Sequence, residues 1–60
     1  MTIIAMERSR DDLIKSVAKY YKTTADKIMI NHYGNVYCNG RKTRLQTDEY
    51  KGFYVCAFIK

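Results

Sequence analysis

The apolar and polar positions of this chain follow helical spacing early in the sequence and period-two spacing later. Apolar residues recur at helical intervals from Leu13 to Tyr21, with basic and polar residues between them. This is the pattern of an amphipathic helix. Ser9 is a suitable N-cap, and Asp12 three residues later completes a sequence similar to a capping box. We therefore predict a helix over residues 10–22.

Shorter elements flank this helix. Thr23 or Thr24 followed by Ala25 and Asp26 can cap one further helical turn that ends near Ile28. We expect a short N-terminal strand over residues 2–5. Residues 28–30 alternate in the manner of a strand, and the sequence Asn-His-Tyr-Gly-Asn at 31–35 is typical of a turn.

A two-residue β-hairpin is the strongest local prediction. Asn39-Gly40 tolerates the positive φ angles of a type I′ turn, whose twist matches that of the flanking strands. Residues 36–38 and 41–45 are then paired strands. The predicted pairs are Cys38 with Arg41, Tyr37 with Lys42, Val36 with Thr43, and Asn35 with Arg44.

The end of the chain predicts a turn and a final strand. Residues 46–52 are polar, and residues 53–59 are almost continuously apolar. With no linker or repeat in the sequence, we expect a single domain over residues 1–60. The predicted fold is α+β, with one helix packed on a three- or four-stranded antiparallel sheet in the order (β)αβββ.

The hairpin register separates two faces. Val36, Cys38, Thr43 and Leu45 would point toward the helix, and Asn35, Tyr37, Lys42 and Arg44 would point to solvent, with Arg41 at the rim. An exposed aromatic ring between cations can stack a nucleobase while the cations contact phosphates. Tyr33 could extend this surface. The alternative, an ordinary polar solvent face, stays open.

The charge balance is basic: 11 Lys and Arg residues against six Asp and Glu give a formal charge of +5. This favours anionic partners but is equally compatible with a charge kept for solubility. Lys15, Lys19 and Lys22 would form a second basic stripe on the helix. A structural role explains these lysines equally well, because Asp11 can form an i, i+4 ion pair with Lys15 and lysines near the helix end interact favourably with the helix dipole. A helix-turn-helix is excluded because the second helix is too short.

No catalytic or metal-binding pattern is present. His32, Cys38 and Cys56 lack the paired spacings of zinc sites, and nothing suggests an orienting third group for Cys–His chemistry. We expect a non-enzymatic protein without metal or cofactor. No apolar run approaches the ~20 residues of a membrane span. Two cysteines are few for a secreted chain of this length, so we expect free thiols and a cytoplasmic location.

The final strand is apolar on both faces. Phe53, Val55, Ala57 and Ile59 would lie on one side, where a single small helix could not cover them together with the other side. We expect a homodimer through these four residues; the alternative, that the N-terminal strand and the helix cover both faces in one monomer, stays open.

Two functions follow from these features. The first is a small accessory or regulatory protein that binds nucleic acid through Tyr33, Tyr37, Arg41, Lys42 and Arg44. The alternative is a modulator or inhibitor that binds an acidic protein partner through the same face or the last strand, of the kind that phages and mobile elements encode. A salt titration separates the two.

Overall fold

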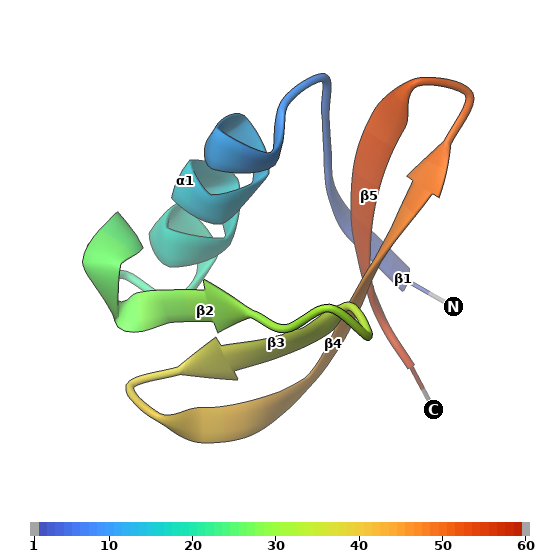
Figure 1. Ribbon diagram of the computed structural model, residues 1–60. Helices are drawn as coiled ribbons and strands as arrows, with labels where there is room; N and C mark the ends of the chain where they lie inside the picture. The colour runs from blue at the N-terminus through green and yellow to red at the C-terminus, as the bar shows by residue number, and fades with distance from the viewer. Residues whose placement is uncertain (1, 60) are drawn as a thin grey trace.

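The computed structural model describes residues 2–59. One helix lies against the inner face of a bent, five-stranded antiparallel sheet, which is an α+β architecture (Figure 1). The strand order across the sheet is β1-β5-β4-β3-β2. The elements are β1 (Thr2–Glu7), α1 (Arg10–Tyr20), the 3-10 helix η1 (Ala25–Lys27), β2 (Ile28–Ile30), β3 (Asn35–Cys38), β4 (Arg41–Tyr50) and β5 (Phe53–Phe58).

The helix begins where its capping sequence predicts. The Ser9 hydroxyl accepts a hydrogen bond from the backbone N–H of Asp12 at 3.1 Å, which satisfies one of the free N–H groups of the first turn. The predicted end was two residues too late, because α1 stops at Tyr20 and Lys22 adopts a left-handed φ of 57°. The backbone N–H of Thr23 then bonds to the Ala18 carbonyl, as in a Schellman C-cap.

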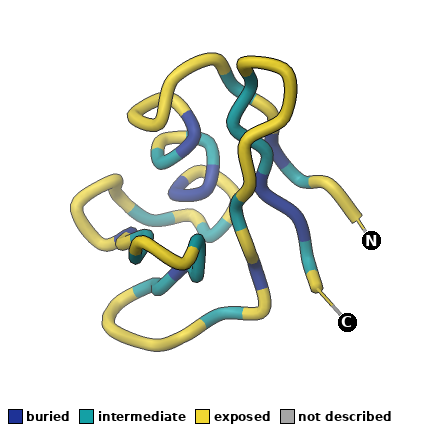
Figure 2. Tube along the Cα trace, turned by 45° about the vertical axis from the view of Figure 1, so that its right-hand side comes forward, coloured by how far each residue is buried: buried dark blue, intermediate teal, exposed yellow. Residues whose placement is uncertain are grey.

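The core lies between α1 and the inner face of the sheet. Leu13 and Val17 of α1 are almost completely buried against Val36, Leu45 and Cys56 of the strands. Figure 2 shows that the buried positions gather where the helix faces the sheet, whereas the hairpin turns are exposed. The predicted inward face of the β3–β4 hairpin is confirmed at Val36 and Leu45.

The predicted strand count of three or four was wrong, because the sheet has five strands. The segment 46–52 was predicted as a turn, but β4 continues through residues 46–50. Each of these five residues pairs with a residue of β5. Its polar residues are compatible with a strand because most of them face solvent. The turn is Lys51-Gly52 alone, with φ angles of 50° and 83°, close to those of Asn39-Gly40.

The hairpin register is correct near the Asn39-Gly40 turn and wrong farther from it. Cys38 pairs with Arg41 and Tyr37 with Lys42, but Asn35 pairs with Gln46 rather than Arg44. Two extra residues of β4 therefore interrupt the ladder. The Thr43 hydroxyl fills the gap by donating to the Val36 carbonyl at 2.8 Å.

This irregularity divides the sheet into two parts. As Figure 1 shows, β4 bends; its first half pairs with β3, which in turn pairs with β2, and its second half pairs with β5, which in turn pairs with β1. A bulge that inserts extra residues is expected to bend and twist a strand in this way. The basic residues of β4 lie on the first half, and its acidic residues Asp48 and Glu49 lie on the second.

Candidate nucleic-acid interface

The β3–β4 hairpin places an aromatic ring beside a cation on the outer face of the sheet. Tyr37 and Lys42 are directly opposed in register, and directly opposed side chains share one face at close range. Tyr37 is half-buried, whereas Lys42 is exposed. Arg41 follows the turn, and Arg44 lies two residues beyond Lys42 on the same face; both are exposed. The structure therefore brings together Tyr37, Lys42 and Arg44, whereas Arg41, opposed to the core-facing Cys38, lies at the rim beside the turn.

Strand β2 contributes residues that the sequence analysis missed. Met29 pairs with Tyr37 and has 59% of its surface exposed on the same outer face. Lys27, the last residue of η1, directly precedes β2, and its carbonyl accepts a hydrogen bond from the Asn39 N–H at 2.9 Å. The alternation of Ile28, Met29 and Ile30 carried the signal for Met29, because two inward isoleucines place the residue between them outward.

The fifth predicted residue, Tyr33, projects from the turn between β2 and β3. The Asn31 side-chain oxygen accepts hydrogen bonds from the backbone N–H groups of Tyr33 and Asn35, at 3.0 and 2.9 Å. This arrangement is an Asx-type turn, which fixes the backbone locally. Tyr33 is 70% exposed, and its ring lies 4.1 Å from that of His32, centre to centre. The turn thus holds a pair of aromatic rings in solvent.

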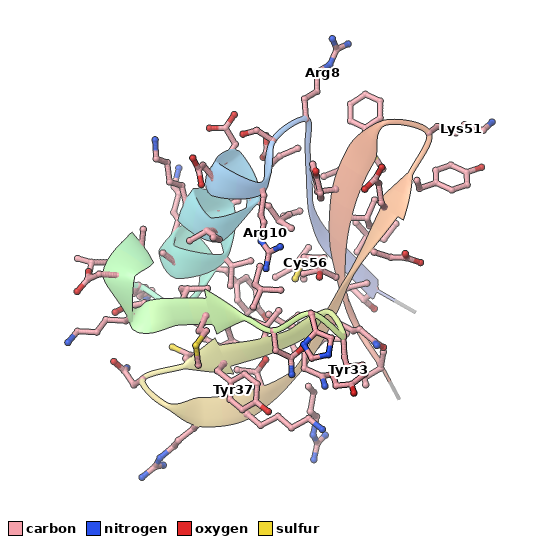
Figure 3. All side chains as sticks on the ribbon, in the orientation of Figure 1. Arg8, Arg10, Tyr33, Tyr37, Lys51 and Cys56 are labelled. Carbon is pink, nitrogen blue, oxygen red and sulfur yellow. The ribbon has the colours of Figure 1, made fainter. Side chains whose placement is uncertain are left out.

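A cleft of about 250 Å³ lies behind this turn. Arg10 reaches it from the start of α1, and its guanidinium donates to the Ile30 carbonyl at 2.8 Å. Figure 3 shows the Arg10 side chain pointing from the helix toward β2, with Tyr33 and Tyr37 below it. Asp48, Glu49 and half-buried Tyr54 also line the cleft. The cleft is smaller than the usual site of a drug-sized ligand.

The charges of β4 are distributed in favour of an anion at the hairpin. Arg41, Lys42 and Arg44 are three of its first four residues, and the carboxylates of Asp48 and Glu49 follow only on its second half. Near the hairpin, Asp26 adjoins Lys27, and a hydrogen bond from the Thr24 side chain is the main cause that lowers the Asp26 pKa. The hairpin itself is therefore basic, and the ionised Asp26 carboxylate offsets part of the charge beside it at Lys27.

The second predicted basic stripe lies on a different layer of the molecule. Lys15 and Lys19 are exposed on α1, and Lys22 is exposed just beyond its end. Because α1 covers the inner face of the sheet, these lysines do not join the basic residues of the outer face.

The remaining chemistry-bearing residues are separated. Cys56 is completely buried in the core, and this burial raises the pKa of its thiol to about 11. Cys38 is half-buried, and both cysteines are free. Among residues 2–59, no three His, Cys, Asp or Glu side chains are grouped so that they could hold a metal ion.

Comparisons with known proteins identified no relative: no protein-family model, no curated protein and no solved structure matches the chain. The α1 helix has 11 residues, and over residues 2–59 no helix is long and apolar enough to cross a membrane.

Proposed function

We propose that this protein binds nucleic acid through the basic surface, which we define as Tyr33, Tyr37, Arg41, Lys42 and Arg44. The observation that carries the proposal is the directly opposed pair of Tyr37 and Lys42 on the outer face, with two exposed arginines on the same strand. The protein would then be an accessory or regulatory factor that holds a strand without acting on it chemically.

The arrangement favours single-stranded nucleic acid. Base–aromatic stacking contributes about 1–3 kcal/mol per base and tolerates any sequence, because every base has a π-face. Tyr37 is held in the sheet by its neighbours, and Tyr33 is held by the Asn31-centred turn. Unpaired bases can stack on such rings, whereas bases inside a duplex are inaccessible to them. The cations of the hairpin would contact the phosphates.

An acidic protein partner is the second candidate. Met29 is exposed beside Tyr37, and a flexible thioether is a common component of surfaces that bind other proteins. Such an interface would combine the same cations with an apolar centre. It would depend less on salt than a phosphate backbone does.

A salt titration tests the proposal. Fluorescence anisotropy with a labelled 20-nucleotide single strand and the matching duplex gives Kd at several salt concentrations. For single strands, log affinity falls by about 0.7 per log unit of salt for each phosphate neutralised. We expect Lys42→Ala and Arg44→Ala each to weaken binding and to reduce this slope by about 0.7. Lys15→Ala, on the separate helix layer, is the matched control and should change neither quantity.

The aromatic contribution is tested separately. Tyr37→Ala should weaken single-strand binding about tenfold or more, and Tyr37→Phe should retain most of it, because stacking needs the ring and not the hydroxyl. The proposal fails if neither nucleic acid binds at low salt. It also fails if a lysate partner captured by the wild-type protein survives nuclease treatment and is lost with Lys42→Ala, which would favour the protein-binding alternative.

A further inference from the structure

The outer face of β1, β5 and the end of β4 carries an apolar surface that adjoins the basic surface, because Ile59 lies beside Lys42 and Arg44. Register places Ile3 beside Ala57, Met6 beside Val55, and Tyr50 beside Phe53. We call this the outer apolar face; its members are Ile3, Met6, Tyr50, Phe53, Val55 and Ile59. It includes three of the four residues that the sequence predicted for an oligomer interface.

Four of these six side chains are unusually exposed for their type, whereas Phe53 and Val55 are half-buried. Ile3 is 55% exposed, Met6 47%, Tyr50 60% and Ile59 44%. Ala57, the fourth predicted interface residue, lies on this face but is only 4% exposed, because larger neighbours in the adjacent strands surround it. Contiguous exposed apolar surface on a small protein commonly marks an interaction site.

The structure restricts how the final strand can associate. Both edges of β5 are already occupied, by β1 and by β4. Edge-to-edge pairing through β5 is therefore excluded, and the residues 53–59 can meet a partner only through their outer face. Two sheets that pack face to face keep their strands within about 30° of one another.

We propose that a second copy of this chain covers the outer apolar face, by two-fold packing of the two sheets. In the arrangement we favour, the two-fold axis lies between the two sheets and runs perpendicular to their strands. Each strand of one copy then lies over the same strand of the other copy, β1 over β1 and β5 over β5. The apolar strands then meet each other at the centre. With the axis along the strands, the apolar side chains of β1 would instead face the polar strand β4, and Met6 would lie over the Asp48 carboxylate.

Charge complementarity supports this choice. On β4, the outward positions run Arg44, Gln46, Asp48 and Tyr50. A two-fold axis across the strands reverses this order in the second copy. With the axis midway between Gln46 and Asp48, Asp48 lies opposite the second copy's Gln46. The second copy's Arg44 is the next outward residue along that strand, and its long side chain can reach the Asp48 carboxylate. The symmetry forms this ion pair twice, at the polar rim of the interface, where Arg44 belongs both to this face and to the basic surface.

A specific dimer would have to cover a substantial part of the chain's surface. A standard interface buries about 800 Å² per partner, which is roughly one sixth of the 4607 Å² accessible surface of this chain. The outer apolar face spans three of the five strands. Closed two-fold symmetry is also the commonest form of self-association.

Sedimentation equilibrium over a hundredfold concentration range tests the proposal. We expect the wild-type protein to dimerise and Met6→Lys to be a folded monomer, since a partly exposed side chain is replaced. Met29→Lys is the matched control, because Met29 is exposed on the other part of the sheet, and it should dimerise like the wild type. Circular dichroism confirms that each variant is folded.

A charge exchange tests the orientation. Asp48→Arg should weaken dimerisation at least tenfold, and the double variant Asp48→Arg with Arg44→Asp should restore it. A wild-type monomer at every concentration would overturn the proposal. So would a dimer that tolerates both Met6→Lys and Asp48→Arg, which would indicate pairing through the free edge of β1. Failure of the charge exchange to restore dimerisation would overturn the proposed orientation.

Discussion

The carbonyl oxygen of Gly34 accepts two hydrogen bonds from Thr47, one from its backbone N–H at 2.8 Å and one from its hydroxyl at 3.2 Å. These bonds connect the turn between β2 and β3 to the middle of β4. Because Tyr33 precedes Gly34, they also fix the place from which the Tyr33 ring projects. The close approach is possible only because residue 34 has no side chain.

Replacing Gly34 by Ala should therefore destabilise the fold strongly. A Cβ atom at this position would lie 2.6 Å from the Thr47 carbonyl oxygen, and φ is +86°. Left-handed backbone alone costs an L-residue about 1–2 kcal/mol, and relief of the clash adds to this. We expect a loss of more than about 2 kcal/mol in the free energy of unfolding, measured by urea denaturation.

Gly40→Ala is the matched control for this substitution. Gly40 has a similar φ of +78°, but a Cβ atom there would meet nothing within 4 Å. Its loss should be about 1 kcal/mol, from backbone strain alone. Equal losses for the two variants would show that the contact with Thr47 has no energetic importance.

Local signals predicted the parts of the fold that local chemistry determines. Ser9 and Asp12 located the start of α1, and Asn39-Gly40 located the hairpin and its first two pairs. Side chains directly opposed across that turn were thus correctly assigned to the outer face. The neighbouring positions of Tyr37 and Lys42 were predictable for this reason, whereas Arg44 is exposed as predicted although its predicted pairing with Asn35 is wrong.

Features set by distant contacts were not predictable. The polar sequence of residues 46–50 has no strong strand signal, and it is extended because β5 pairs with it on one side. The interruption near Thr43 depends on a hydrogen bond to Val36 across the hairpin. The Lys51-Gly52 turn was missed because lysine is an uncommon residue at positive φ.

Ser9→Ala should weaken the start of the helix. The substitution removes the hydroxyl that accepts the Asp12 N–H, and the loss of such a cap costs about 0.5–2 kcal/mol. Ser9→Asp retains an acceptor and serves as the control, with little change expected. Thermal denaturation followed by circular dichroism measures both, and an unchanged melting temperature for Ser9→Ala would contradict the capping role.

Lys22→Gly should stabilise the protein. Lys22 adopts φ 57° at the C′ position of α1, where glycine is the preferred residue. Relief of the left-handed strain should exceed the entropy that glycine adds to the unfolded chain, giving a gain of about 0.5–1 kcal/mol. Lys22→Ala removes the same charge without relieving the strain, so a gain equal to that of Lys22→Gly would attribute the effect to charge.

The buried thiol of Cys56 should make the fold sensitive to alkaline pH. Burial raises its pKa to about 11, from an ordinary value of 9.0. Between these values the unfolded chain releases the thiol proton while the folded chain keeps it. Folding therefore binds a proton in this range, and stability falls as pH rises. At 1.36 kcal/mol per pKa unit, the loss should approach about 2 kcal/mol by pH 11.

Urea denaturation at pH 8 and at pH 10.5 measures this loss, and Cys56→Ala is the control for all other groups that titrate there. The variant should be less stable at pH 8 but should show a smaller fall on going to pH 10.5. Thiol alkylation gives an independent check: half-buried Cys38 should react in the native protein, and Cys56 only after unfolding, because the thiolate is the reactive form and the buried thiol resists ionisation. Equal alkylation rates for the two cysteines in the folded protein, or an identical pH dependence in Cys56→Ala, would contradict the burial of this thiol.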